Sequence, residues 1–236
     1  MRRDHVKNRH HCTISGHPVR VMENGAMTDK TPLPDRGWRG SPELWLDAAY
    51  DALIDKGVDA VKILPLANSL NLSRTSYYWF FKDRRALLLA LLQRWEATTT
   101  EPLLEITKAC AATEAEAILG VISIFLGDIG FDRRLELAVR AWAQQDADVA
   151  DMLQEADAKR LLALRELLLR WGHGEEDADV RARTIYLVQI GYISMRITES
   201  VEERIQRVPY YVEVYSGQRP SADEMARFRA RVTVPD

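Results

Sequence analysis

The chain has 236 residues, of which 47% are hydrophobic and 28% are charged, as is usual for a protein that folds around a buried core. This composition excludes collagen-like, disulfide-rich and wholly disordered chains. The longest strongly apolar stretch, Ala117 to Gly127, is about half as long as a membrane-spanning helix and therefore predicts no transmembrane segment. Two distant cysteines and the lack of a signal-peptide pattern favour a protein of the reducing cytoplasm.

The net charge of −3 hides an uneven distribution of charge along the chain. Residues 1–35 carry 6 Lys/Arg against 4 Asp/Glu, and residues 36–95 carry 9 against 6. Residues 96–236 carry 17 against 25. A basic front followed by an acidic body is compatible with a small anion-binding module on a larger domain that avoids polyanions.

Residues 1–35 show no helical or strand periodicity and contain several glycines and prolines, so we expect a disordered tail. The tail includes His10, His11, Cys12 and His17, but their spacing matches no structural zinc pattern, and we expect no metal site. Residues 1–26 are expected to be dispensable, because the sequence from Met27 resembles an ordinary start.

From Ser41 onward the apolar residues recur with helical spacing, and no segment alternates as a strand would, so we predict an all-α fold. The first helix begins after Ser41, a capping residue, and ends at Gly57. A short second helix spans about 62–70, and Asn71, which tolerates positive φ, follows it. A third helix runs from Ser73 to about Phe80, and a long fourth helix runs from Asp83 to about residue 107.

The second and third helices form the arrangement that presents a recognition helix to the major groove of DNA. The predicted recognition helix contains Arg74, two hydroxyl side chains and several aromatic rings. Arginine can pair with guanine, hydroxyl groups reach bases or phosphates, and aromatic edges pack on thymine methyl groups. On residue chemistry alone, it is equally open that these aromatic residues belong to a hydrophobic core, because aromatic residues with helical spacing often do.

The stretch from Trp45 to Leu88 resembles the N-terminal DNA-binding domain of TetR-family transcriptional regulators. The matching features are Leu46-Asp47-Ala48-Ala49 in the first helix, Gly57 at its end, Leu66-Ala67 in the second helix, and Tyr78, Phe81 and Leu87 farther on. These positions agree in order and without gaps. The resemblance implies that residues 36–88 form a three-helix helix-turn-helix domain. It also implies that residues 89–236 form a helical ligand-binding and dimerisation domain.

The resemblance also implies how individual side chains would meet double-stranded DNA. Recognition-helix residues would face bases and phosphates, aromatic residues after them would press on the sugar-phosphate backbone, and cations at the start of the fourth helix would bind phosphate. Arg36 and Arg39, just before the first helix, could reach phosphate or the minor groove as an arm, although a solvated surface charge is the alternative for either one. The full predicted set is Arg74, Thr75, Ser76, Tyr78, Trp79, Phe80, Lys82, Arg84 and Arg39.

Five positions depart from the pattern of the family, of which Arg84, in place of a usual lysine, keeps the positive charge. Lys62 replaces the usual hydroxyl residue at the start of the second helix, Leu64 replaces a frequent arginine, and Pro65 follows it. Phosphate contacts from the second helix are therefore in doubt. Asn71 stands where glycine is common, a substitution that its tolerance of the left-handed region permits.

The acidic body contains two helices that are more apolar than a surface helix should be, one over 148–171 and one over 178–199. We expect a second subunit to cover them in a four-helix homodimer interface. Two buried helices of a larger monomeric core are the alternative.

A cavity between the helices of the body would take a small hydrophobic or aromatic effector, because the sequence singles out no cluster of buried Lys or Arg. Its candidate lining residues are Phe125, Ile129, Trp142, Met152, Trp171, Tyr186, Gln189 and Tyr192.

No catalytic motif, cofactor-binding loop or metal-ligand set is found in the sequence, so we expect no enzyme and no cofactor. The predicted function is a ligand-responsive repressor that binds a near-palindromic operator as a homodimer. A helical protein-interaction module without specific DNA binding is the alternative, suggested by Leu64, Pro65 and the apolar Phe80.

Overall fold

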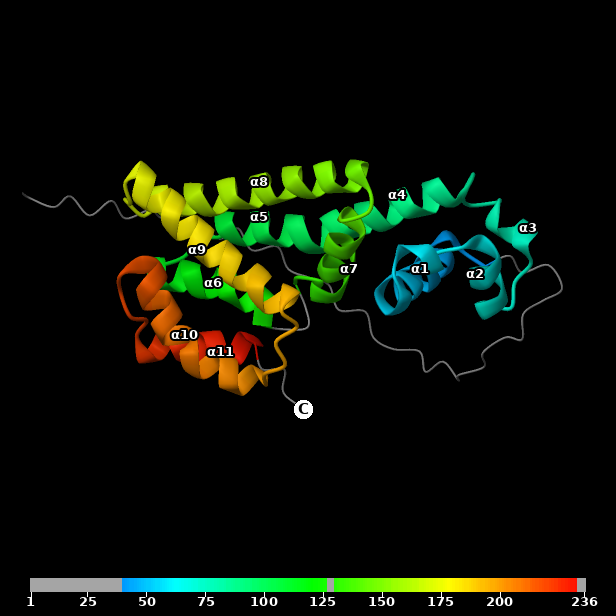
Figure 1. Ribbon diagram of the computed structural model, residues 1–236. Coiled ribbons are helices and arrows are strands. Elements are labelled where there is room, and N and C mark those ends of the chain that lie inside the picture. Colours follow the sequence, from blue (N-terminus) through cyan, green and yellow to red (C-terminus); the bar gives the residue numbers. More distant parts are fainter. Residues whose placement is uncertain (1–39, 127–129, 233–236) are drawn as a thin grey trace, which may run out of the picture. The chain divides into compact units, whose positions relative to one another are not determined.

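The computed structural model of the protein describes residues 40–126 and 130–232, which belong to one compact unit, Arg39–Asp236. The predicted tail, Arg36, Arg39 and Ile129 lie outside the described residues, as do His10, His11, Cys12 and His17. Within the described ranges every regular element is a helix, which confirms the all-α prediction (Figure 1). The elements are α1 (Pro42–Lys56), η1 (Val58–Ala60), α2 (Ile63–Ser69), α3 (Arg74–Tyr77), α4 (Arg84–Trp95), η2 (Glu96–Thr100), α5 (Glu101–Lys108), α6 (Glu114–Leu126), α7 (Arg133–Ala143), α8 (Ala147–Arg170), α9 (Glu175–Ser194), α10 (Val201–Ser216) and α11 (Ala222–Val232).

The ends of α1 have the local chemistry that the sequence predicts. The Ser41 hydroxyl accepts a hydrogen bond from the backbone N–H of Leu44, and Pro42 occupies the first turn, where no N–H is needed. Gly57 ends the helix with a φ of 79°, a value that L side chains rarely adopt. Trp45, Ala49 and Leu53 lie on the buried face of the helix.

The fourth predicted helix is a continuous helical segment with an irregular middle. The Asp83 carboxylate caps α4 by accepting from the backbone N–H of Ala86 at 2.9 Å. Between α4 and α5, residues 96–100 form a π-helical turn, and Pro102 lies in the first turn of α5. The predicted extent to about residue 107 agrees with the end of α5 at Lys108.

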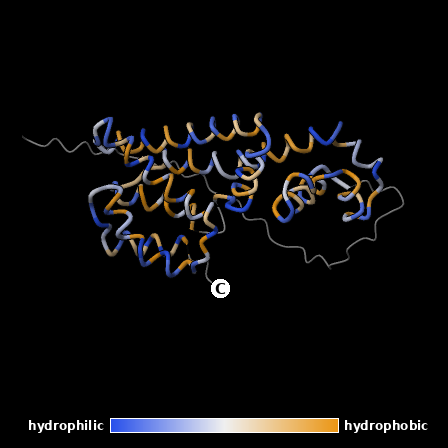
Figure 2. The backbone as a smooth tube through the Cα atoms, viewed as in Figure 1, coloured by the Kyte–Doolittle hydropathy of each residue, from blue (hydrophilic) through white to orange (hydrophobic). Residues whose placement is uncertain are grey.

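The buried hydrophobic residues form two clusters. The first joins α1–α4 to α7 and the first half of α8. The second joins α5 and α6 to the second half of α8 and to α9, α10 and α11. Figure 2 shows hydrophobic residues running through α6, which is buried along most of its length. Because α8 contributes to both clusters, it links the helices around the predicted recognition helix to those of the acidic body.

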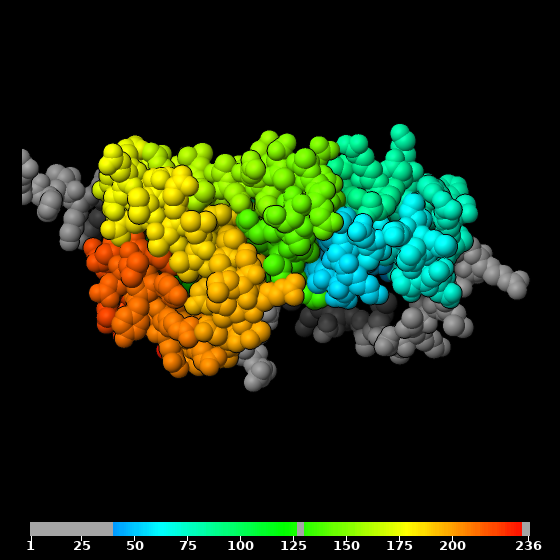
Figure 3. Space-filling view, viewed as in Figure 1, coloured from blue at the N-terminus to red at the C-terminus, as the bar shows by residue number. Residues whose placement is uncertain are grey.

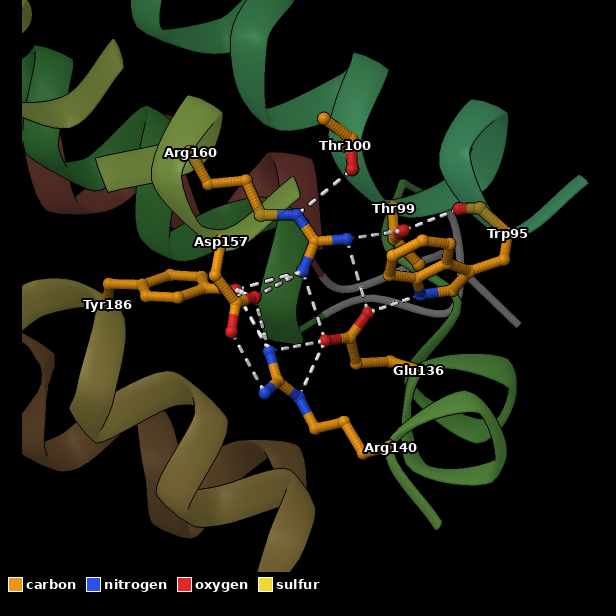
Figure 4. A network of polar contacts seen from close by, with 8 residues as sticks. All are labelled: Trp95, Thr99, Thr100, Glu136, Arg140, Asp157, Arg160 and Tyr186. Atoms are coloured by element: carbon orange, nitrogen blue, oxygen red, sulfur yellow. Dashed lines mark hydrogen bonds and ion pairs between the residues drawn. The ribbon is translucent and has the colours of Figure 1, made fainter. Parts of the chain in front are cut away.

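A buried polar network draws its members from both clusters (Figure 4). Arg160 and Glu136 are each fully buried and form an ion pair at 3.0 Å. The indole of Trp95 donates to the same Glu136 carboxylate at 2.6 Å. The remaining members are Thr99, Thr100, Arg140, Asp157 and Tyr186.

The sequence pattern overestimates the length of α9. The helix ends at Ser194 rather than near residue 199, and Arg196 then adopts a left-handed φ of 51°. A capping box between Ser200 and Glu203 starts the separate helix α10. The apolar pattern continues through this break because Ile197 and Val201 extend the hydrophobic run, which hides the boundary.

Candidate DNA-binding site

Helix α3 is short, and the residues around it fix its position. The Ser73 hydroxyl caps the helix by accepting from the backbone N–H of Ser76 at 3.2 Å. Tyr77 is fully buried and packs edge-on against Trp45 of α1, with ring centroids 5.2 Å apart. Its hydroxyl donates to the backbone carbonyl of Asp83 at 2.7 Å, and burial raises the pKa of Tyr77 to about 12. The hydroxyl therefore remains a donor and ties α3 to the start of α4.

Arg74 and Thr75 of α3 are exposed to solvent, as are Tyr78 and Trp79 directly after the helix. Tyr78 is 47% exposed and Trp79 is 63% exposed, which are large values for aromatic side chains. A guanidinium nitrogen of Arg74 donates to the Tyr78 hydroxyl at 3.2 Å. This exposed surface therefore combines a cation, a hydroxyl group and two aromatic rings within about two helical turns.

Ser76 and Phe80 also belong to the predicted DNA-binding set, but they are less exposed than its other members around α3. Ser76 is buried, and its hydroxyl donates to the backbone carbonyl of Ser73 at 2.6 Å. Phe80 is half-buried and packs against the first hydrophobic cluster. Both side chains thus have packing or hydrogen-bonding contacts within the domain.

Arg84 makes two hydrogen bonds inside the domain. Its Nε donates to the carbonyl of Val61 at 2.6 Å, and one terminal nitrogen donates to the carbonyl of Val58 at 2.7 Å. Both acceptors lie around η1, so Arg84 connects the start of α4 to the segment that precedes α2. The neighbouring Lys82 and Arg85 are exposed.

The predicted effector-pocket residues do not all meet. Phe125, Gln189 and Tyr192 line one cavity of about 300 Å³. Tyr186 belongs to the buried polar network, and Trp171 is 37% exposed at the end of α8. Trp142 and Met152 lie with the first hydrophobic cluster.

Sequence reasoning missed four arginines that line the same cavity, namely Arg133, Arg134, Arg196 and Arg204. They come from the start of α7, the turn after α9 and the first half of α10. Only the adjacent pair on α7 is visible as a basic group in the sequence. The others are brought close by the turn between α9 and α10, which no periodicity predicts.

Two kinds of feature are absent from the described part of the chain. No group of three or more His, Cys, Asp or Glu residues among residues 40–126 and 130–232 could hold a metal ion. None of the described helices is long and apolar enough to cross a lipid bilayer.

Comparisons with known proteins agree with the helix-turn-helix geometry. The family model described as "Bacterial regulatory proteins, tetR family" matches residues 46–91, which span α1 to most of α4. The sequence has no significant match among curated proteins.

Two solved structures show the extent of the similarity in fold. The fatty acid degradation regulator FadR from Bacillus halodurans aligns with a TM-score of 0.57 and 14% identity, over 78% of this chain and 97% of that chain. Salmonella enterica GusR aligns with a TM-score of 0.55 and 14% identity, over 81% of this chain and 94% of that chain. At this identity the similarity concerns the fold, and it extends well beyond the helix-turn-helix domain. Residues 46–91, which include the capped helix α3, therefore match the N-terminal domain of the tetR family of bacterial regulatory proteins, and the chain as a whole shares the fold of these two proteins.

Proposed function

We propose that the protein is a ligand-responsive repressor that binds a near-palindromic operator as a homodimer in the cytoplasm. The observation that supports this function best is the exposed surface formed by Arg74 and Thr75 of α3 and by Tyr78 and Trp79 directly after it. Ser73 and Tyr77 hold this segment in place. Aromatic residues that belonged only to a core would not be exposed in this way.

In the proposed complex, α3 enters the major groove. Arg74 and Thr75 would contact base edges, where the guanidinium can bridge guanine O6 and N7. Tyr78, Trp79 and Lys82 would lie against the sugar-phosphate backbone and set the register. Arg84, Ser76 and Phe80 would contribute mainly by holding α3 and α4 together, because their contacts are internal.

A homodimer is supported by apolar side chains that remain exposed on α9 and α10. Val180 and Leu187 on α9 are 62% and 61% exposed, and Tyr210 and Val214 on α10 are 58% and 62% exposed. The surfaces of α9 (yellow) and α10 (orange) adjoin on one face in Figure 3. On α8, Leu162 is exposed, whereas Leu164, Leu167 and Leu168 are buried in the second cluster. We therefore propose an interface centred on α9, with α10 as its neighbour and α8 at its margin.

Two subunits related by a two-fold axis would place their recognition helices in successive major grooves, about 34 Å apart. An effector bound in the acidic body would favour dimers in which this spacing is wrong. By linkage, the effector must then bind the DNA-free protein more tightly than the DNA-bound protein. Regulation of transcription, rather than catalysis, accounts for these features.

Selection of genomic DNA fragments by the purified full-length protein, followed by footprinting, tests this proposal. The expected footprint has two half-sites related by two-fold symmetry with centres about 10 base pairs, or a multiple of that, apart. An asymmetric footprint would contradict the homodimer on a near-palindrome. Recovery of no enriched fragment would instead favour a helical protein-interaction module.

A further inference from the structure

The cavity that contains Phe125, Gln189 and Tyr192 has both apolar and cationic walls. It lies where the end of α6, the start of α7, the end of α9 and the start of α10 meet, and its volume is about 300 Å³. This volume is at the lower end of the range for small-molecule sites. Phe125, Leu137 and Ile193 supply apolar surface, so the cavity suits a compact ligand with a hydrophobic body.

Arg204 is the best-placed cation in this cavity. Its guanidinium donates to the carbonyl of Phe125 at 3.3 Å and to the side-chain oxygen of Gln189 at 3.4 Å. It also lies 4.4 Å from the centre of the Tyr192 ring. Burial and the nearby charge of Arg133 lower the pKa of Arg204. The hydrogen bonds of Arg204 are long and go to neutral groups. Because a guanidinium group binds a carboxylate more strongly than a neutral acceptor, a carboxylate in the cavity would be a better partner for Arg204.

The described side chains that line the cavity are either cationic or uncharged. None of the described lining residues is Asp or Glu, whereas four are Arg. The nearby carboxylate of Glu199 pairs with Arg207 at 2.6 Å, and that of Asp55 pairs with Arg134 at 3.6 Å. Within residues 40–126 and 130–232, Arg204 itself has no carboxylate at ion-pairing distance.

We propose that this cavity binds an organic monocarboxylate with a compact apolar body, with Arg204 as the main partner of the carboxylate. Gln189 would add a side-chain amide, and Arg196 would add positive charge at the rim. The inference rests on the proposed ligand-responsive function for its regulatory meaning, and it changes the expected effector from a neutral hydrophobic molecule to an anion.

The position of the cavity also connects the ligand to the DNA-binding domain. Arg134 lies at the start of α7 and pairs with Asp55 near the end of α1. Leu135 and Val139 of α7 pack in the first hydrophobic cluster together with α1 and α4. A carboxylate near the start of α7 would therefore compete with Asp55 for Arg134 and weaken a contact made by the DNA-binding domain.

Calorimetric titration of the full-length protein without DNA tests the site. The probes are benzoate, 2-naphthoate and octanoate, each compared with its primary amide, which has nearly the same shape but no charge. We expect at least one carboxylate to bind about 10-fold or more tightly than its amide, because hydrogen bonds to charged groups are stronger than those between neutral groups.

Three variants assign the preference to this cavity. Arg204→Met should remove the preference for the carboxylate, and Arg196→Gln should weaken it by about two- to fivefold, as for an exposed charge pair. Arg183→Gln is the matched control, because Arg183 is an exposed arginine of α9 that pairs with Asp179 and does not line the cavity. Because Arg196 is exposed, Arg196→Gln should fold. This variant therefore still tests the site if Arg204→Met fails to fold.

The inference is overturned if no carboxylate binds more tightly than its amide, or if the preference survives in folded Arg204→Met or is unchanged in Arg196→Gln. The operator-binding assay is separate from this titration. Specific DNA binding without a carboxylate preference would leave the regulator intact and refute this site. If a carboxylate binds through Arg204 but does not change operator affinity, the binding site is supported and its regulatory function is refuted.

Discussion

At the level of single residues, two arginines of the same region make different contacts because their neighbours differ. Arg74 of α3 is exposed and contacts the Tyr78 hydroxyl and ring, whereas Arg84 makes two hydrogen bonds to backbone carbonyls. The sequence shows both as cations near a recognition helix. Only the fold separates the exposed arginine from the one that supports the domain.

Replacing Arg84 should therefore affect folding before it affects DNA recognition. Arg84→Gln removes charge-assisted hydrogen bonds to Val58 and Val61, and we expect a loss of about 1.5–3 kcal/mol in the free energy of unfolding. Urea denaturation followed by circular dichroism measures the loss. Arg85→Gln is the control, because Arg85 is exposed and should change stability by less than about 0.5 kcal/mol. Equal stability of the two variants would refute the bracing function of Arg84.

Arg160 offers a second residue-scale test, in the buried network. Its guanidinium contacts Glu136, Tyr186 and two threonines, and Glu136 is as fully buried as Arg160. Arg160→Met leaves part of a buried carboxylate without its partner, which costs about 3–5 kcal/mol in comparable sites. We expect a correspondingly large fall in denaturation midpoint. Arg160→Met combined with Glu136→Leu should lose less than the single variant, and a larger loss would contradict this account.

At the scale of elements, the sequence predicts helices best where local chemistry sets their ends. Ser41 caps α1, Asp83 caps α4, and Asn71 adopts a positive φ of 53°, all as expected. The break between α9 and α10 is not predictable in the same way, because its apolar residues continue the helical pattern. The arginine-lined cavity depends on that break, so its cationic character also required the fold.

The turn between α8 and α9 should make stability depend on pH. His173 contacts Asp177 at 2.8 Å and Glu114 of α6 at 2.6 Å. Burial alone would lower the pKa of His173, but the hydrogen bonds to these two carboxylates outweigh burial and raise it above the ordinary 6.5. Its contribution to stability is therefore fully present below about pH 6.5 and is lost as pH rises through the higher folded-state pKa.

Denaturation curves between pH 6 and pH 9 check this effect. The wild-type protein should lose more stability over that range than His173→Gln, which lacks the titrating group. Parallel curves for the two proteins would show that His173 does not couple the α8–α9 turn to α6 in this way.

At the scale of the whole molecule, two hydrophobic clusters share α8 and meet at a polar network. Arg160 and Glu136 join helices of the DNA-binding side, such as α4, to helices of the acidic body, such as α9 (Figure 4). The helical pattern of the sequence and the resemblance of residues 45–88 predict a helix-turn-helix domain followed by a helical body. It does not predict the network, because residues far apart in the chain supply its partners.

The proposed homodimer makes a prediction at this scale. Leu187→Glu places a charge in the middle of the exposed apolar surface of α9 and should yield monomers in light scattering. Its operator affinity should fall steeply because two linked half-sites are no longer bound together. Leu162→Glu, at an exposed position of α8, should have a smaller effect. Dimers that persist in Leu187→Glu would rule out an interface centred on α9.

In the proposed function, the exposed residues of α3 and of the turn after it recognise a specific DNA sequence. Fluorescence anisotropy with the selected genomic fragment and a scrambled fragment, across a salt series, tests this recognition. The wild-type protein should prefer the selected fragment, and Arg74→Ala should lose about 1–3 kcal/mol of binding on that fragment while binding scrambled DNA almost unchanged. Lys82→Ala, a proposed phosphate contact, should instead weaken binding to both and reduce the salt slope by about one. Equal, weak binding of the wild-type protein and Arg74→Ala to both fragments would contradict the account.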